Sequence, residues 1–226
     1  MRPNPSWEHV YGLALAEQGV DTPIEALRAA LREVYRSGGY GFEGRVEPSP
    51  EASFRRLVEL DRQALELVGV RDLPETFYRR LAELFMVTSH WHVFPDVYEA
   101  IEGLQRRGLR LGVISNWSWQ LPELLHALDL VQHFDVLAVS ARIGVDKPHP
   151  MIFEHALRLA GVSPDEAIHV GDNLEADVAG AHATGLSAVL IDRAGRVREA
   201  PAGVPVIGSL ADLLPLVDRR LPTAVG

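Results

Sequence analysis

Residues 167–185 read AIHVGDNLEADVAGAHATG, and this stretch decides the fold. Its first part is a short apolar run that ends at Gly171 and Asp172, which predicts a buried strand. Its second part predicts a helix, with Asp177 placed five residues after Asp172. A buried strand followed directly by a helix is the repeating unit of a parallel α/β sheet.

The same unit recurs on both sides of this stretch. Apolar runs predict further strands within residues 109–115, 134–140 and 187–192, and helices within residues 93–108, 119–130 and 150–161. A final apolar segment, residues 204–217, completes the run. Continuous apolar strands that alternate with helices indicate a parallel sheet covered on both faces. We therefore predict an α/β fold for residues 93–226, a Rossmann-like three-layer α/β/α core.

Residues 1–92 predict helices only. Four helical segments are expected within residues 4–19, 21–39, 49–69 and 73–91, with a loop over residues 40–48. Asn4 is the expected cap of the first helix, and Ser49 followed by Pro50 predicts the start of the third. Gly38 and Gly39 are expected to end the second helix. The chain is thus predicted to hold an all-helical unit, residues 1–92, and the α/β unit, residues 93–226.

Composition excludes several classes of function. The 226 residues include no cysteine, so disulfides, zinc–thiolate sites and thiol nucleophiles are excluded. The formal net charge is −9 and no Lys/Arg cluster stands out, which argues against nucleic acid and anionic membranes as partners. No apolar run is long enough to span a bilayer. No export signal opens the sequence, so we expect a cytoplasmic protein.

Lys147 is the one lysine among the 22 strong cations of the chain; the others are arginines. It lies in the segment VDKPHP, directly before Pro148. Genome composition explains a general preference for arginine. It does not explain why one lysine is kept, and a compact ammonium has different chemistry from a planar guanidinium.

Polar residues follow three of the predicted strands. Ser115 and Asn116 end one strand, Lys147 lies in the loop after the next, and Asp172 and Asp177 follow the third. Ligands of open α/β sheets bind at the carboxyl ends of the strands. A hydroxyl and an ammonium can bind phosphate oxygens, and two carboxylates can hold Mg²⁺, which prefers oxygen ligands. The pattern predicts a phosphate and magnesium site.

Each of these residues also has a structural interpretation. Ser115 alone is typical of a turn, and Lys147 of an exposed loop. Asp172 is a suitable cap for the following helix, and Asp177 suits a solvated helix face. Beyond this set, Trp117 fits either the entrance of a site or packing, and His169 fits a buried position in a strand.

Three segments resemble motifs of the haloacid dehalogenase-like hydrolase superfamily: VISN (113–116), KPHPMIFEHAL (147–157) and HVGDNLEADVAGAHATG (169–185). The resemblance implies that residues 1–92 form an α-helical cap domain and residues 93–226 the core. It implies that Ser115, Asn116 and Lys147 bind phosphate, with Lys147 also catalytic. Asp172 and Asp177 would bind Mg²⁺, directly or through water.

Within the superfamily, the intact GDNLEAD segment favours a Mg²⁺-dependent phosphomonoesterase that acts on a small phosphorylated metabolite. A metal-independent 2-haloacid dehalogenase is a less favoured alternative, because such enzymes usually lack this pattern. The main alternative to the phosphomonoesterase is a catalytically silent protein that binds a phosphate ligand or a partner, and dehalogenation ranks after it. We expect a monomer or a homodimer.

The resemblance has one departure. The family's first motif, D-x-[DG]-x-T after a central strand, supplies the aspartate nucleophile, and the printed sequence does not contain it. Asp21, Asp61, Asp72 and Asp96 all lie in other contexts. A start codon placed too late, a shortened chain and a non-hydrolytic relative each explain this. We expect the first, with the central strand encoded upstream of Met1, and we expect the chain as printed to be inactive.

Overall fold

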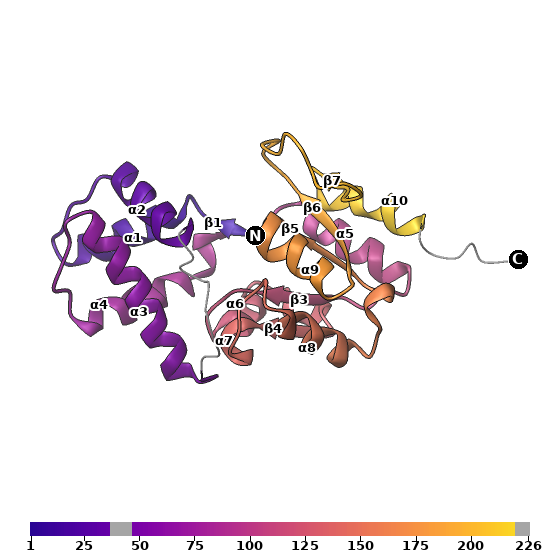
Figure 1. Cartoon of the computed structure of the whole chain (residues 1–226). Coiled ribbons are helices and arrows are strands. Elements are labelled where there is room, and N and C mark those ends of the chain that lie inside the picture. The colour runs from indigo at the N-terminus through magenta and orange to yellow at the C-terminus, as the bar shows by residue number, and fades with distance from the viewer. Residues whose placement is uncertain (37–46, 220–226) are drawn as a thin grey trace, which may run out of the picture. The chain divides into compact units, whose positions relative to one another are not determined.

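The computed structural model describes residues 1–36 and 47–219, and the chain divides into two compact units (Figure 1). Unit 1 comprises Met1–Phe94, Asn116–Val131 and Ala141–Gly144, and unit 2 comprises Pro95–Ser115, Gln132–Ser140 and Val145–Gly226. The expected division into domains at residues 92 and 93 stays a prediction. The expected helix end at Gly38 and Gly39 lies outside the described residues, as does most of the loop 40–48.

Four helices of unit 1 bury one common core: α1 (Trp7–Glu17), α2 (Ile24–Arg36), α3 (Pro50–Leu67) and α4 (Glu75–Phe85). The unit also includes α6 (Leu121–Ala127) and the short α7 (Ser140–Ile143), whose first residue belongs to unit 2. Apolar residues at helical spacing meet in the core, among them Val10, Leu27, Leu65 and Leu81. Burying such side chains is the main favourable term in folding.

The helix starts follow the sequence in one case and not in another. Ser49 caps α3 as predicted, because its Oγ accepts a hydrogen bond from the backbone N–H of Ala52 at 3.1 Å. The prediction that Asn4 caps α1 is wrong, since α1 begins only at Trp7, after Ser6. The backbone N–H of Asn4 instead donates to the carbonyl of His90 at 2.7 Å.

The expectation that residues 1–92 hold helices only is also wrong. Strand β1 (Arg2–Pro3) pairs antiparallel with β2 (Trp91–His92), so that Arg2 lies opposite His92 and Pro3 opposite Trp91. Two residues are too few for an alternating pattern, so hydrophobic periodicity cannot reveal these strands. The pairing brings the first residues of the chain beside residues 91 and 92.

Unit 2 confirms the predicted parallel α/β core. Strand β3 (Gly112–Ser115) pairs with β4 (Val136–Val139), and β5 (Ile168–Gly171) pairs with β6 (Ser187–Ile191), which pairs with β7 (Val206–Ile207). All these pairs are parallel. The connecting helices are α5 (Asp96–Arg106), α8 (Pro150–Ala160), α9 (Gly180–Ala183) and α10 (Leu213–Asp218).

Helices cover both faces of the β5–β6–β7 sheet, as side chains along β5 show. Ile168 and Val170 pack with Leu104 of α5 and with Leu213 and Val217 of α10. The ring of His169, between them in the strand, lies against Phe153 of α8 with a 5.2 Å centroid distance. Successive strand residues face opposite sides of a sheet, so these contacts define the three layers.

Strands β3 and β5 each have a free edge among the described residues. β3 pairs with β4 alone and β5 with β6 alone, so the strands of unit 2 form two sheets. Every residue of β3 is exposed or half-buried, although Val113 and Ile114 are apolar. Apolar parallel strands are normally paired and buried on both sides. The expected central strand is therefore absent from the described part of the sheet.

No helix in the described ranges is both long and apolar enough to cross a membrane.

Candidate active site

The predicted site residues of unit 2 lie where the strands end. Ser115 ends β3, and Asp172 directly follows β5. Lys147 precedes α8, which begins at Pro150. Asp177 lies in η4 (Leu174–Ala179), a π-helical turn between β5 and α9. Such turns are often found at functional sites. The four residues thus come from the carboxyl-end loops that bind ligands in α/β sheets.

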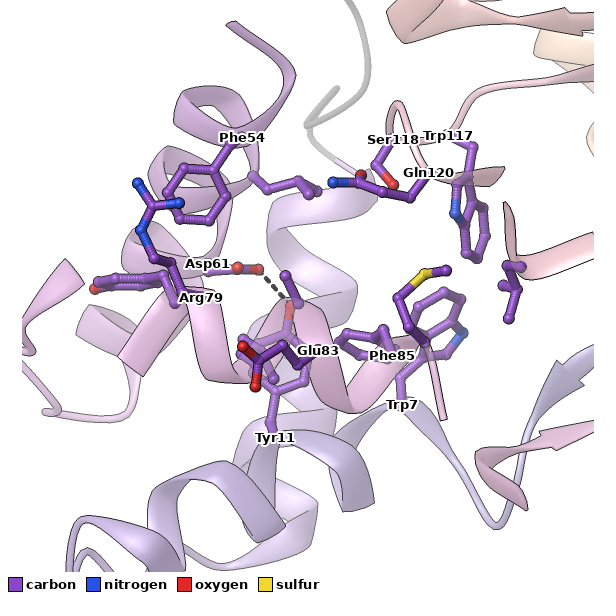
Figure 2. Close-up of a pocket in the computed structure, with 16 residues that line it drawn as sticks. Trp7, Tyr11, Phe54, Asp61, Arg79, Glu83, Phe85, Trp117, Ser118 and Gln120 are labelled. Atoms are coloured by element: carbon purple, nitrogen blue, oxygen red, sulfur yellow. Dashed lines mark hydrogen bonds between the residues drawn. The ribbon is translucent and has the colours of Figure 1, made fainter. Parts of the chain in front are cut away.

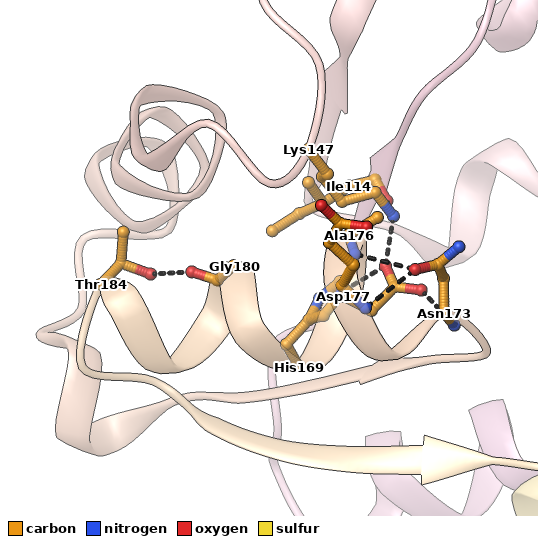
Figure 3. Close-up of polar contacts among 9 residues, drawn as sticks. Ile114, Lys147, His169, Asn173, Ala176, Asp177, Gly180 and Thr184 are labelled. Atoms are coloured by element: carbon orange, nitrogen blue, oxygen red, sulfur yellow. Dashed lines mark hydrogen bonds and ion pairs between the residues drawn. The ribbon is translucent and has the colours of Figure 1, made fainter. Parts of the chain in front are cut away.

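Asp177 is the centre of a buried polar cluster (Figure 3). Its Oδ1 accepts a hydrogen bond from Lys147 Nζ at 2.6 Å and lies 3.0 Å from His169 Nε2. Its Oδ2 accepts from the backbone N–H of Asn173 at 2.9 Å. Figure 3 shows Lys147 and His169 reaching the carboxylate from opposite sides. Both oxygens of Asp177 are therefore engaged.

Lys147 connects the two sheets of unit 2. Besides its ion pair with Asp177, Nζ donates a 2.9 Å hydrogen bond to the carbonyl oxygen of Ile114, in β3. One ammonium thus contacts the end of β3 and the turn after β5. The side chain of Lys147 is 12% exposed and that of Asp177 is 5% exposed. The structure therefore rules out both the exposed loop position of Lys147 and the solvated position of Asp177.

The cluster holds Asp177 as a carboxylate. Burial alone would raise the pKa of Asp177. The hydrogen bond from His169 and the charge of Lys147 outweigh burial and hold this pKa well below its usual range. Asp177 therefore stays negatively charged at any ordinary pH.

Gly171 makes room for this carboxylate. A Cβ atom at position 171 would lie 2.1 Å from Cγ of Asp177, far inside van der Waals contact. Only glycine leaves this space open. Glycine is therefore required at position 171 for a steric reason: the side chain of Asp177 packs directly against the backbone of Gly171.

Asp172 does not cap the following helical turn. Asn173 takes that role, because its Oδ1 accepts hydrogen bonds from the backbone N–H groups of Glu175 and Ala176 at 2.9 and 2.8 Å. Asp172 itself is exposed. The interpretation of Asp172 as a helix cap is therefore wrong. Its carboxylate faces solvent at the end of β5.

Ser115 and Asn116 are neighbours in the chain but fall in different units. Ser115 is half-buried at the end of β3, one residue after the carbonyl that Lys147 contacts. Asn116 belongs to unit 1. The roles of both as phosphate ligands stay predictions.

Two members of the cluster were not predicted. His169 is buried in β5, as expected, but its hydrogen bond to Asp177 was not foreseen. The cap formed by Asn173 was also missed. Their positions in the sequence could have indicated these roles. His169 lies two residues before Gly171, and Asn173 directly follows Asp172.

The donor set suits a magnesium ion only in part. Asp172 and Asp177 offer hard carboxylate oxygens, the ligands that Mg²⁺ prefers. Within residues 1–36 and 47–219, however, no three potential metal-binding side chains gather in one place. Both oxygens of Asp177 already accept hydrogen bonds. Asp172, whose side chain is exposed, and Asp177 are the residues that would hold such an ion, and its other ligands would have to come from elsewhere.

The fold and this cluster define a Rossmann-like α/β protein with a lysine–carboxylate pair at the carboxyl ends of its strands. A family model described as haloacid dehalogenase-like hydrolase matches residues 3–185. The chain belongs to this hydrolase family, as its motifs predicted.

Several known proteins are similar to the chain. Human haloacid dehalogenase-like hydrolase domain-containing protein 3 is 32% identical over 92% of this chain and 85% of its own length. A phosphoserine phosphatase of Thermus thermophilus is 33% identical over 67% of this chain and 61% of its own. The crystal structure of a 2-haloacid dehalogenase from Pseudomonas syringae is 27% identical with a TM-score of 0.61, covering 91% of this chain and 86% of that one.

Proposed function

We propose that unit 2 is the core of a Mg²⁺-dependent phosphomonoesterase for a small phosphorylated metabolite. The observation that carries this proposal is the position of Lys147, whose ammonium joins the end of β3 to Asp177 beyond β5. A compact cation there can meet a phosphate oxygen while it neutralises a carboxylate. The phosphatase among the relatives supports the same chemistry.

In this proposal each polar residue has one task. Ser115 and Asn116 donate hydrogen bonds to phosphate oxygens, and Lys147 stabilises the negative charge that develops on the transferred group. Asp172 and Asp177 hold Mg²⁺, which when bound offsets the charge between substrate and carboxylates. His169 positions Asp177 from the far side. In this proposal all these residues serve one anion at the carboxyl ends of the strands.

The nucleophile is the missing part of this machinery. The family reaction begins with attack of an aspartate on phosphorus, and the printed residues hold no D-x-[DG]-x-T. The free edges of β3 and β5 are suited to a further parallel strand. We propose that such a strand, encoded upstream of codon 1, supplies the aspartate, and that the printed chain does not turn substrate over.

The test compares the printed chain with a chain extended by the upstream codons. Only the extended chain should release phosphate from p-nitrophenyl phosphate, and only with Mg²⁺. Asp172→Asn should lower its rate on the order of 10²-fold, while Asp165→Asn, which changes an exposed carboxylate, should not. Two results would overturn the proposal that an upstream strand supplies the nucleophile. One is a stop codon within about fifteen codons upstream of codon 1. The other is Mg²⁺-dependent turnover by the printed chain that Asp172→Asn abolishes.

Two other functions would give different results from those of a phosphomonoesterase. Similarity to a 2-haloacid dehalogenase favours halide release as the second candidate, and release of chloride from 2-chloropropionate without Mg²⁺ would establish it. A silent phosphate-binding protein would bind inorganic phosphate through Lys147 and turn over neither substrate. We further propose a cytoplasmic protein, a monomer or homodimer, without nucleic-acid or membrane partners.

A further inference from the structure

Unit 1 contains a pocket of its own, with a volume of about 300 Å³ (Figure 2). Its walls come from α1, α3, α4 and the segment that leads into α6. Aromatic and aliphatic side chains form most of the wall, and the rings that line it include Trp7, Phe54, Phe85 and Trp117. The volume is at the small end of the range for ligand sites.

The aromatic wall is held together by ring contacts. Trp7 lies 5.3 Å from Phe85 and 5.6 Å from Trp117 between ring centroids. These are the distances at which aromatic pairs attract one another. Trp117, which the sequence assigned either to a site entrance or to packing, takes part in both the ring cluster and the pocket wall.

Asp61 of α3 lines this pocket and is 7% exposed. Tyr11 Oη donates a 2.5 Å hydrogen bond to Oδ1 of Asp61. Figure 2 shows the carboxyl group between the Phe54 side of the pocket and the side formed by Phe85 and Trp7. A buried carboxyl thus lies beside the apolar and aromatic side chains of the wall.

Among the described residues, no cation forms an ion pair with Asp61. The nearby arginines are engaged elsewhere. Arg79 pairs with Glu75 at 2.5 Å and stacks over Phe54, and Arg62 pairs with Glu59. Burying a carboxylate without a cation is costly. This burial raises the pKa of Asp61 to about 7, although the hydrogen bond from Tyr11 opposes the change.

We propose that this pocket binds a small organic ammonium ion, with Asp61 as its carboxylate partner and the aromatic rings around the cation. Carboxylates form strong charge-assisted hydrogen bonds with ammonium groups. Aromatic faces attract cations through their negative π surface. A bound ammonium supplies the positive charge that the buried carboxyl lacks.

The other charges of the pocket do not favour a different ligand. Arg79 and Glu83 have opposite signs and lie largely in solvent, with 61% and 67% of their side chains exposed. Burial raises the pKa of Tyr78, so this phenol stays neutral. Ser118 and Gln120 add no charge. Asp61 is therefore the buried acidic group of the cavity, and an anionic ligand would be repelled once Asp61 is ionised.

A purely structural role explains the pair less well. Tyr11 and Asp61 connect α1 to α3, but a neutral amide in place of the carboxyl would make the same connection without the cost of burying a charge. The carboxyl also lines an open cavity rather than closed packing. The inference concerns unit 1 alone and does not depend on the reaction proposed for unit 2.

Calorimetric titration of the full chain with two matched probes tests the proposal. Benzylammonium and benzyl alcohol are similar in size but differ in charge. At pH 8, benzylammonium should bind on the order of tenfold more tightly than the alcohol. At pH 5.5 this preference should largely disappear, because Asp61 becomes protonated. Equal binding of the two probes at pH 8 would overturn the proposal.

Three variants test whether the carboxyl group of Asp61 causes the preference for benzylammonium over benzyl alcohol. Asp61→Asn should abolish the preference for the cation while binding of benzyl alcohol stays unchanged. Glu59→Gln removes an exposed charge of the same helix and should keep the preference. Tyr11→Phe leaves the carboxyl but removes its hydrogen bond, so the pH at which the preference appears should rise. A preference that survives Asp61→Asn, or that is lost in Glu59→Gln, contradicts the assignment.

Discussion

Lys147 and Asp177 form an ion pair of 2.6 Å that is almost closed to solvent, and the same ammonium contacts the backbone of β3. Charges in such a place are costly to bury singly and are tolerated as a pair. The same ion pair therefore belongs to the candidate site and contributes to the stability of unit 2.

Replacement of Lys147 by methionine should destabilise the chain by about 3–5 kcal/mol, because Asp177 would remain buried without its cation. Lys147→Arg should lose less, since the charge stays while a larger planar group must fit. Arg106→Met, which breaks an exposed pair with Glu102, should cost under about 1 kcal/mol. Urea unfolding measures all three. A Lys147→Met protein as stable as the original would show that the pair is not stabilising.

Gly171→Ala should destabilise the protein by about 1–3 kcal/mol, because the new Cβ would lie 2.1 Å from Cγ of Asp177. The matched control is Gly208→Ala, since a Cβ at that position meets nothing within 4 Å. Thermal melts of the two variants are compared directly. Similar melting temperatures would mean that Asp177 can move aside at no cost.

Asp61→Asn should stabilise the protein at high pH. The pKa of Asp61 is about 7 in the folded state against 3.8 ordinarily, so folding is penalised as pH rises above about 4. The penalty is complete above pH 7 and amounts to as much as about 4 kcal/mol. The gain in the free energy of unfolding should thus be large at pH 8 and small at pH 4.5. Equal gains at both values would exclude ionisation of Asp61 as the cause.

Asp96, at the start of α5, should stabilise unit 2 at neutral pH and lose this effect in acid. Burial would raise its pKa, but hydrogen bonds from Arg193, Ser209 and the backbone of Leu210 lower it to about 2. Its contribution is complete above about pH 4 and is lost as pH falls through 2. Asp96→Asn should cost about 1.5–3 kcal/mol at pH 7 and much less at pH 2.

Unfolding of this variant is followed by circular dichroism from pH 7 to pH 2. The exposed Asp21→Asn serves as the control and should behave like the original at every pH. An Asp96→Asn protein that matches the original at pH 7 would show that these hydrogen bonds do not stabilise unit 2.

The sequence predicted the α/β part of the fold because its strands are continuous apolar runs and its helices have clear periodicity. The β1–β2 pair could not be predicted, since two residues carry no pattern and the partners are about ninety positions apart. The start of α1 was misplaced because Asn4 is a good cap by residue type, whereas its backbone is used in pairing with His90.

The meeting of Lys147 with Asp177 was predictable from residue type and from the rule that carboxyl ends of parallel strands share one edge. The hydrogen bond of His169 was not, because it depends on the π-helical turn that sets the orientation of Asp177. The burial of Asp61 was equally hidden. Its hydrogen-bond partner Tyr11 lies 50 positions earlier in the chain, and nothing in the local sequence of α3 marks that position.

The short β1–β2 ladder has an evolutionary consequence. Because Pro3 lies opposite Trp91, the chain leaves for the helices and returns from them at the same place. A turn of a few residues would be enough to connect these two points. A change in the length of the segment 4–90 therefore need not redirect the chain that follows, which gives evolution a simple route to relatives with different helical inserts at this place.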